Sequence, residues 1–224
     1  MGLILNLETA TTNCSVSLAN DGEVLALKEH DTPNYSHSEQ LHVFIQECME
    51  KAGRNLSELD AIAVSKGPGS YTGLRIGVSA AKGLCFSIGV PLISIATLKS
   101  MAFQIKVSEG EFIIPVLDAR RMEVYSAVFN SDLKQIRETR AEIIDEKSFE
   151  DYTKNQKVSI VGNGAEKIKP ILKYPDIKFE SYIIPSAKDM APLSFKKYLE
   201  KDFENIAYFE PYYLKDFILQ LSKK

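Results

Sequence analysis

The chain has few of the residues that carry most disulfide and metal chemistry. Its 224 residues include three cysteines and three histidines. Cys14, Cys48 and Cys85 are widely spaced and lie among apolar residues, so we expect reduced, buried thiols. His37 and His42 are five positions apart on a predicted helix, whereas side chains share a helix face at spacings of three or four. We therefore predict no metal site.

Long apolar runs and a strong charge of one sign are also missing. The start, MGLILNLETATTN, lacks the basic flank and long apolar stretch of a signal peptide, and no segment approaches a transmembrane helix in length. These features predict a cytoplasmic protein with no membrane partner. The formal net charge of -3 excludes a protein that coats nucleic acid by charge alone, although it is compatible with a local basic patch.

The usual catalytic motifs are missing as well. The segment GPGSYTGLR lacks the Lys-Ser or Lys-Thr ending of a phosphate-binding P-loop. There is no nucleophile elbow, and no cysteine stands in a polar context that would activate it. We therefore predict no catalytic residue in this chain.

The pattern of apolar residues predicts the same order of elements twice. Each half starts with a short apolar strand that ends in an acid, Glu8 or Asp118, and continues as a hairpin and a third strand. The predicted order in each half is β-β-β-α-β-α-β-α, which gives a mixed sheet with helices on its faces.

This duplication predicts an α/β protein of two lobes with a cleft between them. We place the lobes at residues 1–106 and 107–224. The aromatic and charged segment 207–224 is expected to pack on either lobe or on a partner.

The glycine-rich segment 67–84 admits two interpretations. In the first, the turn and the start of the following helix hold an anion. The candidate contacts are Glu8, Thr9, Lys66, Gly67, Gly69, Ser70 and Arg75. In the second, small residues at helical spacing let a neighbour approach closely, and this explains more of the residues. The small residues are Gly73, Gly77, Ala80 and Ala81. The pattern alone does not say whether that neighbour lies in this chain or in another.

The ordered motifs LNLETATTNCSVSL (5–18), SKGPGSYTGLRIGVSAAKGL (65–84), LDARRMEVYSAVF (117–129) and EPYYLKD (210–216) resemble the bacterial TsaB (YeaZ) family. The resemblance implies the two-lobed, RNase H-like fold of the actin/Hsp70/sugar-kinase superfamily. It also implies a non-catalytic scaffold subunit for N6-threonylcarbamoylation of adenosine 37 in tRNA. The implied partners are a catalytic TsaD-type paralogue, a TsaE-type ATPase and, through the complex, tRNA.

The resemblance further implies that helices 37–52 and 72–88 dock on the partner. The residues carried over for this interface are Leu41, Phe44, Ile45, Cys48, Gly73, Ile76, Gly77, Ala80 and Ala81. The sequence does not divide the side chains of the first helix between core and interface. We expect self-association when the partner is absent, and loss of the complex without loss of folding in Gly77→Leu.

Three positions depart from related patterns, two from that of the catalytic paralogue and one from that of the family itself. Thr97 and Met101 stand where the catalytic paralogue has the two histidines of its metal motif, and neither replaces an imidazole at a transition-metal site. Glu8 stands where Asp is usual. We expect no cofactor bound by this chain alone, and leave open ATP or ADP where subunits meet. The alternative is an ATP-dependent kinase or phosphotransferase of the same superfamily that uses Glu8 and Asp118.

Overall fold

The first half of the chain forms a mixed sheet of five strands. The computed structural model describes residues 1–33, 36–154 and 156–215. Strands β1 to β3 make an antiparallel meander, and β4 and β5 extend it in parallel from β1, in the order β3-β2-β1-β4-β5. The bounds are β1 (Leu3–Glu8), β2 (Asn13–Asn20), β3 (Glu23–Asp31), β4 (Ala61–Gly67) and β5 (Leu92–Ala96). The hairpin turns at Asp21 and Gly22, both at positive φ, as the Asn-Asp-Gly signal predicts.

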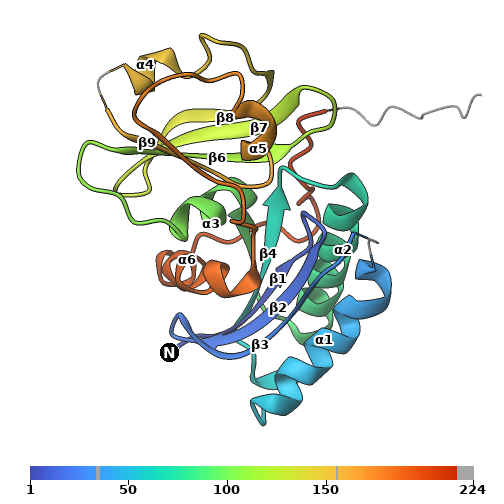
Figure 1. Cartoon of the computed structure of the whole chain (residues 1–224). Coiled ribbons are helices and arrows are strands. Elements are labelled where there is room, and N and C mark those ends of the chain that lie inside the picture. The colour runs from blue at the N-terminus through green and yellow to red at the C-terminus, as the bar shows by residue number, and fades with distance from the viewer. Residues whose placement is uncertain (34–35, 155, 216–224) are drawn as a thin grey trace, which may run out of the picture.

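The second sheet repeats the first. Its order is β10-β9-β6-β7-β8, with an antiparallel meander of β6 to β8 and parallel additions of β9 and β10. The bounds are β6 (Phe112–Asp118), β7 (Glu123–Asn130), β8 (Gln135–Ile143), β9 (Val158–Val161) and β10 (Ile177–Glu180). In each sheet the third, second, first, fourth and fifth strands of that half lie side by side. The predicted duplicated, two-lobed α/β fold is confirmed (Figure 1).

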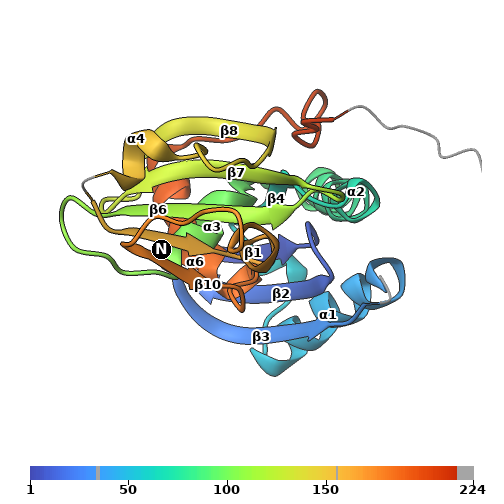
Figure 2. The same cartoon turned by 45° about the horizontal axis from the view of Figure 1, so that its top comes forward.

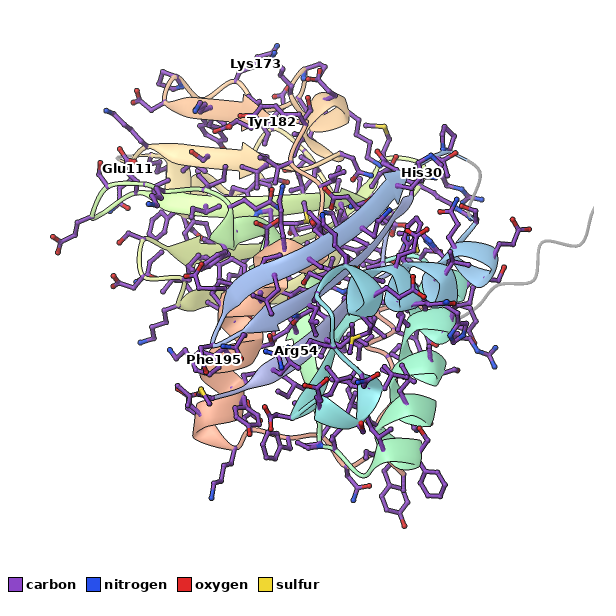
Figure 3. The ribbon with its side chains drawn as sticks, turned by 90° about the horizontal axis from the view of Figure 1, so that it is seen from below. His30, Arg54, Glu111, Lys173, Tyr182 and Phe195 are labelled. Carbon is purple, nitrogen blue, oxygen red and sulfur yellow. The ribbon has the colours of Figure 1, made fainter. Side chains whose placement is uncertain are left out.

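Helices cover both faces of the first sheet. The bounds are α1 (His37–Lys51), α2 (Tyr71–Ile88), α3 (Thr97–Phe103), α4 (Glu150–Thr153), α5 (Ala165–Ile168) and α6 (Ala187–Glu200), with a short 3-10 turn at Leu56–Glu58. Helices α1 and α2 lie side by side and pack on β2 and β4, whereas α6 packs on β1 and β2 from the opposite face (Figures 1 and 3).

Burial on two faces explains why β1 has no exposed residue. Leu3, Leu5 and Leu7 face the core under α1 and α2, and Ile4 contacts the core under α6 with Met190. Side chains of a strand alternate between faces, so a strand covered on both sides reads as continuously apolar. The edge strand β8 is covered less and is largely exposed or half-buried along its length.

Two helices pack across the boundary that the sequence predicts between the lobes. All ten strands respect a boundary between residues 106 and 107. However, α6 follows that boundary and packs on the first sheet, and α3 precedes it and contacts β6. Both helices lie between the two sheets, which Figure 2 shows with α4 beside β8 at the outer edge.

Several elements are shorter than the pattern of apolar residues predicts, among them strands expected over 133–144 and 177–183 and a helix expected over 165–172. The strand expected at 133–144 begins at Gln135, because Leu133 belongs to the preceding turn and has φ 58. The helix expected at 165–172 ends at Ile168, two residues before Pro170, which cannot donate a helical hydrogen bond. The strand expected at 177–183 ends at Glu180, after its last pairing with β9.

Candidate functional site

The glycine-rich turn joins β4 to the start of α2. Gly67 has φ +107, a conformation that side chains other than glycine rarely adopt. The hydroxyl of Ser70 accepts a hydrogen bond from the amide of Gly73 at 3.3 Å, so Ser70, one of the two residues Ser70 and Thr72 that the sequence offers as a cap, caps this helix. One amide at the helix start is therefore satisfied by the chain itself.

The bare backbone of this segment packs against the loop between β1 and β2. A Cβ atom built on Gly69 or Gly73 would stand closer than 3.0 Å to the carbonyl oxygens of Ala10 and Thr9, respectively. At Gly77 it would overlap the hydroxyl of Thr9. The amide of Ser70 also donates to the carbonyl of Ala10 at 2.7 Å. The close neighbour of the glycines thus lies within this chain, which the sequence left open.

A second segment occupies the other side of the turn. The carbonyl of Tyr212 would stand 2.9 Å from a Cβ atom on Gly67. The amide of Tyr212 donates to the carbonyl of Lys66 at 2.7 Å. The turn is therefore packed between residues 9–10 and residue 212. Of the predicted anion contacts, only Lys66 and Arg75 are cations, and they lie on the outside of this packing, half-buried and exposed respectively.

Glu8 ends β1 and is completely buried. Its Oε1 accepts a hydrogen bond from the amide of Ala10 at 2.7 Å, whereas its buried Oε2 has no hydrogen-bond partner among the described residues. Burial raises the pKa of the Glu8 carboxyl from 4.5 to about 7, and the hydrogen bond from Ala10 opposes this rise only in part. The group is therefore poised between its neutral and charged forms near neutral pH.

Asp118 ends β6, the equivalent strand of the second lobe, in a different environment. Its exposed carboxylate accepts hydrogen bonds from the Lys167 ammonium at 2.5 Å and from the amide of Arg120 at 2.7 Å. The amide of Asp118 donates to the side chain of Asn163. Asp118 is thus paired within its own lobe, and no described contact joins it to Glu8.

The residues predicted for a partner interface divide into two sets by burial. Six are buried in this chain, where they belong to the core between the first sheet and helices α1 and α2 or contact Thr9: Leu41, Ile45, Cys48, Gly73, Gly77 and Ala81. These six residues therefore contribute to packing within this chain and offer little accessible surface, and their assignment to a partner interface stays a prediction. Phe44, Ile76 and Ala80 are half-buried and pack on the edge of the same core.

The expected effect of Gly77→Leu also changes. Its side chain would meet Thr9 inside this chain, so the substitution would disturb the fold as well as any complex. Val43 on α1 is 50% exposed, and Phe86 on α2 is 84% exposed. Gly83, also on α2, has open space where a side chain would stand. The sequence analysis did not single out these three residues.

The cysteines and histidines serve the fold. Cys14, Cys48 and Cys85 are free and buried, as predicted, and burial raises their thiol pKa values to about 11, 11 and 12. The Nε2 atom of His37 donates to the carbonyl of Thr11 at 2.7 Å and so fastens the start of α1 to the β1–β2 loop. Within residues 1–33, 36–154 and 156–215, no group of three His, Cys, Asp or Glu residues could hold a metal ion. Thr97 and Met101 are both fully buried.

The segment after α6 contributes contacts that the sequence predicted only in outline. Its described part, up to Lys215, packs on both lobes. Lys82 of α2 donates to the carbonyl of Phe209 at 2.9 Å, and Lys215 donates to the carbonyl of Ala119 at 3.2 Å and pairs with Glu123. The aromatic and charged composition was the only signal for this packing. Residues 216–224 lie outside the described part.

The duplicated sheets, with helices packed on both faces of the first, define a two-lobed α/β protein. Residues 33–220 match a family model described as TsaD, tRNA N6-adenosine threonylcarbamoyltransferase. The chain is 31% identical to the tRNA threonylcarbamoyladenosine biosynthesis protein TsaB of Escherichia coli (strain K12), over 95% of this chain and 94% of that protein. The TsaB protein of Haemophilus influenzae is 30% identical over 95% and 93%. The chain belongs to the TsaB (YeaZ) family.

Solved structures agree with this assignment at the level of the fold. YeaZ from Pseudomonas aeruginosa superposes with a TM-score of 0.84 at 24% identity, covering 96% of this chain and 100% of that chain. Among the described residues, no helix is both long and apolar enough to cross a membrane.

Proposed function

We propose that this protein takes part in the biosynthesis of threonylcarbamoyladenosine in tRNA as a non-catalytic scaffold subunit. The observation that carries the proposal is the likeness to TsaB proteins along nearly the whole chain, together with a surface on α1 and α2 suited to a partner. Its partners are a catalytic TsaD-type paralogue and a TsaE-type ATPase, and tRNA is bound through the complex.

The local geometry supports a scaffold role over catalysis. The glycine turn is filled by Thr9, Ala10 and Tyr212, which leaves its backbone amides little room for a phosphate. Glu8 is buried and Asp118 is paired with Lys167, so neither carboxylate is free of a local constraint. Thr97 and Met101 lack the imidazoles of the metal motif carried by the catalytic paralogue.

The outer surface of α1 and α2 supports docking of a helical partner. Phe86 is a large apolar side chain that is 84% exposed, and Val43 is 50% exposed. Both side chains are accessible for contact with a partner. Gly83 has no side chain, so a second helix can approach the backbone of α2 closely there. The same surface accounts for self-association in the absence of the paralogue.

The docking surface is tested by replacing Val43 and Phe86 together with aspartate. Both side chains are exposed, so we expect the free energy of unfolding to change by less than about 1 kcal/mol. Two carboxylates in an apolar contact would have to be desolvated, and we expect co-purification of the TsaD-type paralogue to fall at least about tenfold. Size-exclusion chromatography of the co-expressed proteins measures this.

The matched control is Ile143→Asp, which alters a side chain that is 68% exposed on β8 of the second lobe. The control should leave the complex intact. Equal retention of the partner by the Val43/Phe86 variant and by wild type would contradict the proposed surface.

The phosphotransferase alternative makes an opposite prediction for the isolated chain. We expect isothermal titration with ATP and magnesium to give no saturable heat, because the turn is packed by the chain itself. Tight binding that disappears in Glu8→Ala would favour the enzyme instead. A site that forms only where subunits meet would bind nucleotide in the complex and not in this chain alone.

A further inference from the structure

The segment from Glu204 to Lys215 is held in place by hydrogen bonds along its length. The amide of Glu204 donates to the carbonyl of Leu92 at 2.8 Å, and its carboxylate accepts a hydrogen bond from Ser94. Lys82 holds the carbonyl of Phe209, and Tyr212 is joined to Lys66 through the backbone. In Figure 1 this red segment runs from the first lobe up to the second. Side chains on it are therefore presented at fixed positions.

This ordered segment exposes two tyrosines around a hollow. Tyr208 is 84% exposed and Tyr212 is 44% exposed, and both line a surface hollow of about 410 Å³ together with Lys66. The packing of the fold does not require either ring at the surface. Large exposed aromatic rings beside a concave surface are typical of a binding site.

A second aromatic group lies at the start of α2. The rings of Tyr71 and Tyr213 are stacked with centroids 4.5 Å apart, and the Arg75 guanidinium lies 5.5 Å from the centroid of Tyr71. We call Lys66, Arg75, Tyr208 and Tyr212 the tyrosine surface. It joins the β4–α2 turn to the C-terminal segment.

The tyrosine surface carries two cations, Lys66 and Arg75. No carboxylate lies within 4.0 Å of the side-chain nitrogens of Lys66 or Arg75 among the described residues. Of the two acids that line the hollow, Glu204 is bonded to Ser94, and Glu210 is exposed at the rim. Lys66 lines the hollow together with these two acids, and Arg75 lies beside the ring of Tyr71 at the start of α2.

We propose that the tyrosine surface binds single-stranded RNA. Unpaired bases stack on Tyr208 and Tyr212, and the adjoining phosphates lie against Lys66 and Arg75. Aromatic rings interleaved with cations are the arrangement that single strands use, because every base has a flat face and every linkage a negative charge. The inference rests on the proposed role in tRNA modification and assigns to this subunit a direct contact with the unpaired part of the RNA.

The test measures RNA affinity with the full-length chain, both alone and assembled with its TsaD-type paralogue. Fluorescence anisotropy follows a short single-stranded RNA with the isolated chain and an unmodified tRNA transcript with the complex. We expect the Tyr208→Ala/Tyr212→Ala variant to lower the affinity for each RNA about tenfold. The Tyr208→Phe/Tyr212→Phe variant should bind each RNA nearly as wild type does. Lys66→Ala/Arg75→Ala should lower the slope of log affinity against log salt by about two.

The control is Tyr182→Ala, which removes a ring that is 73% exposed on the second lobe, away from α1 and α2 (Figure 3). It should leave RNA affinity unchanged. Unchanged affinity of the double Ala variant in both arms would overturn the inference, and weaker retention of a protein partner in that variant would assign the surface to protein docking. Failure of wild type to assemble with the paralogue would count against the proposed function, whereas the isolated-chain arm would still decide the RNA contact.

Discussion

Replacing Gly73 with alanine should destabilise this protein by about 3 kcal/mol, although alanine is the better helix former. The new Cβ atom would stand closer than 3.0 Å to the carbonyl oxygen of Thr9 and 3.1 Å from Cδ2 of His37. Both neighbours are buried, and His37 is itself bonded to Thr11, so the β1–β2 loop has little room to retreat. Urea denaturation followed by circular dichroism measures the free energy of unfolding.

The same substitution at Gly83 provides the control on the same helix. Nothing lies within 4 Å of a Cβ atom there. Alanine at this exposed helical position should stabilise the protein by up to about 1 kcal/mol. If both variants proved equally stable, the close packing of α2 on Thr9 would not hold.

The free energy of unfolding should depend on pH through Glu8. The folded-state pKa of about 7 lies above the ordinary value of 4.5, so the native protein binds the proton more tightly than the unfolded chain does. The contribution of Glu8 to the free energy of unfolding is therefore largest below pH 4.5, and it falls as the pH rises through 7. The fall amounts to about 3 kcal/mol in all.

Glu8→Gln isolates this contribution, because glutamine keeps the oxygen that accepts from Ala10 but does not titrate. The stability of wild type relative to the variant should drop by about 3 kcal/mol between pH 4.5 and pH 8, as followed by urea denaturation across this range. Asp118→Asn is the comparison for the equivalent exposed acid. Parallel pH profiles for wild type and Glu8→Gln would show that the carboxyl does not titrate as its burial requires.

The fold was predicted almost entirely from the order and alternation of apolar residues. Leu3–Glu8 and Phe112–Asp118 both read as buried strands that end in an acid, and both start a meander. The errors were local: Leu133 was assigned to a strand, although it turns, and residues 169–172 were assigned to a helix that ends before Pro170. Pro170 is a local signal for a helix end that the predicted bounds did not use, whereas Leu133 is not a residue type that favours a left-handed turn.

The candidate site was predicted less completely. Small residues at helical spacing in 73–81 indicated a close neighbour, and the structure identifies it as the loop at Thr9 and Ala10. No local sequence pattern predicts which segment this neighbour is, because the contact joins residues more than sixty positions apart. For the same reason the sequence did not separate the buried Leu41 and Cys48 from the exposed Val43 and Phe86 as candidates for docking.

The sequence by itself determined the repeated strand order, the capped start of α2, the buried cysteines and the family, since each depends on neighbouring residues or on matches along the chain. Only the tertiary structure decided that the glycine turn is packed from inside, that Glu8 is buried while Asp118 is paired and exposed, and that Tyr208 and Tyr212 stand beside Lys66. These properties depend on which distant segments meet, and burial and charge compensation exist only once they have met.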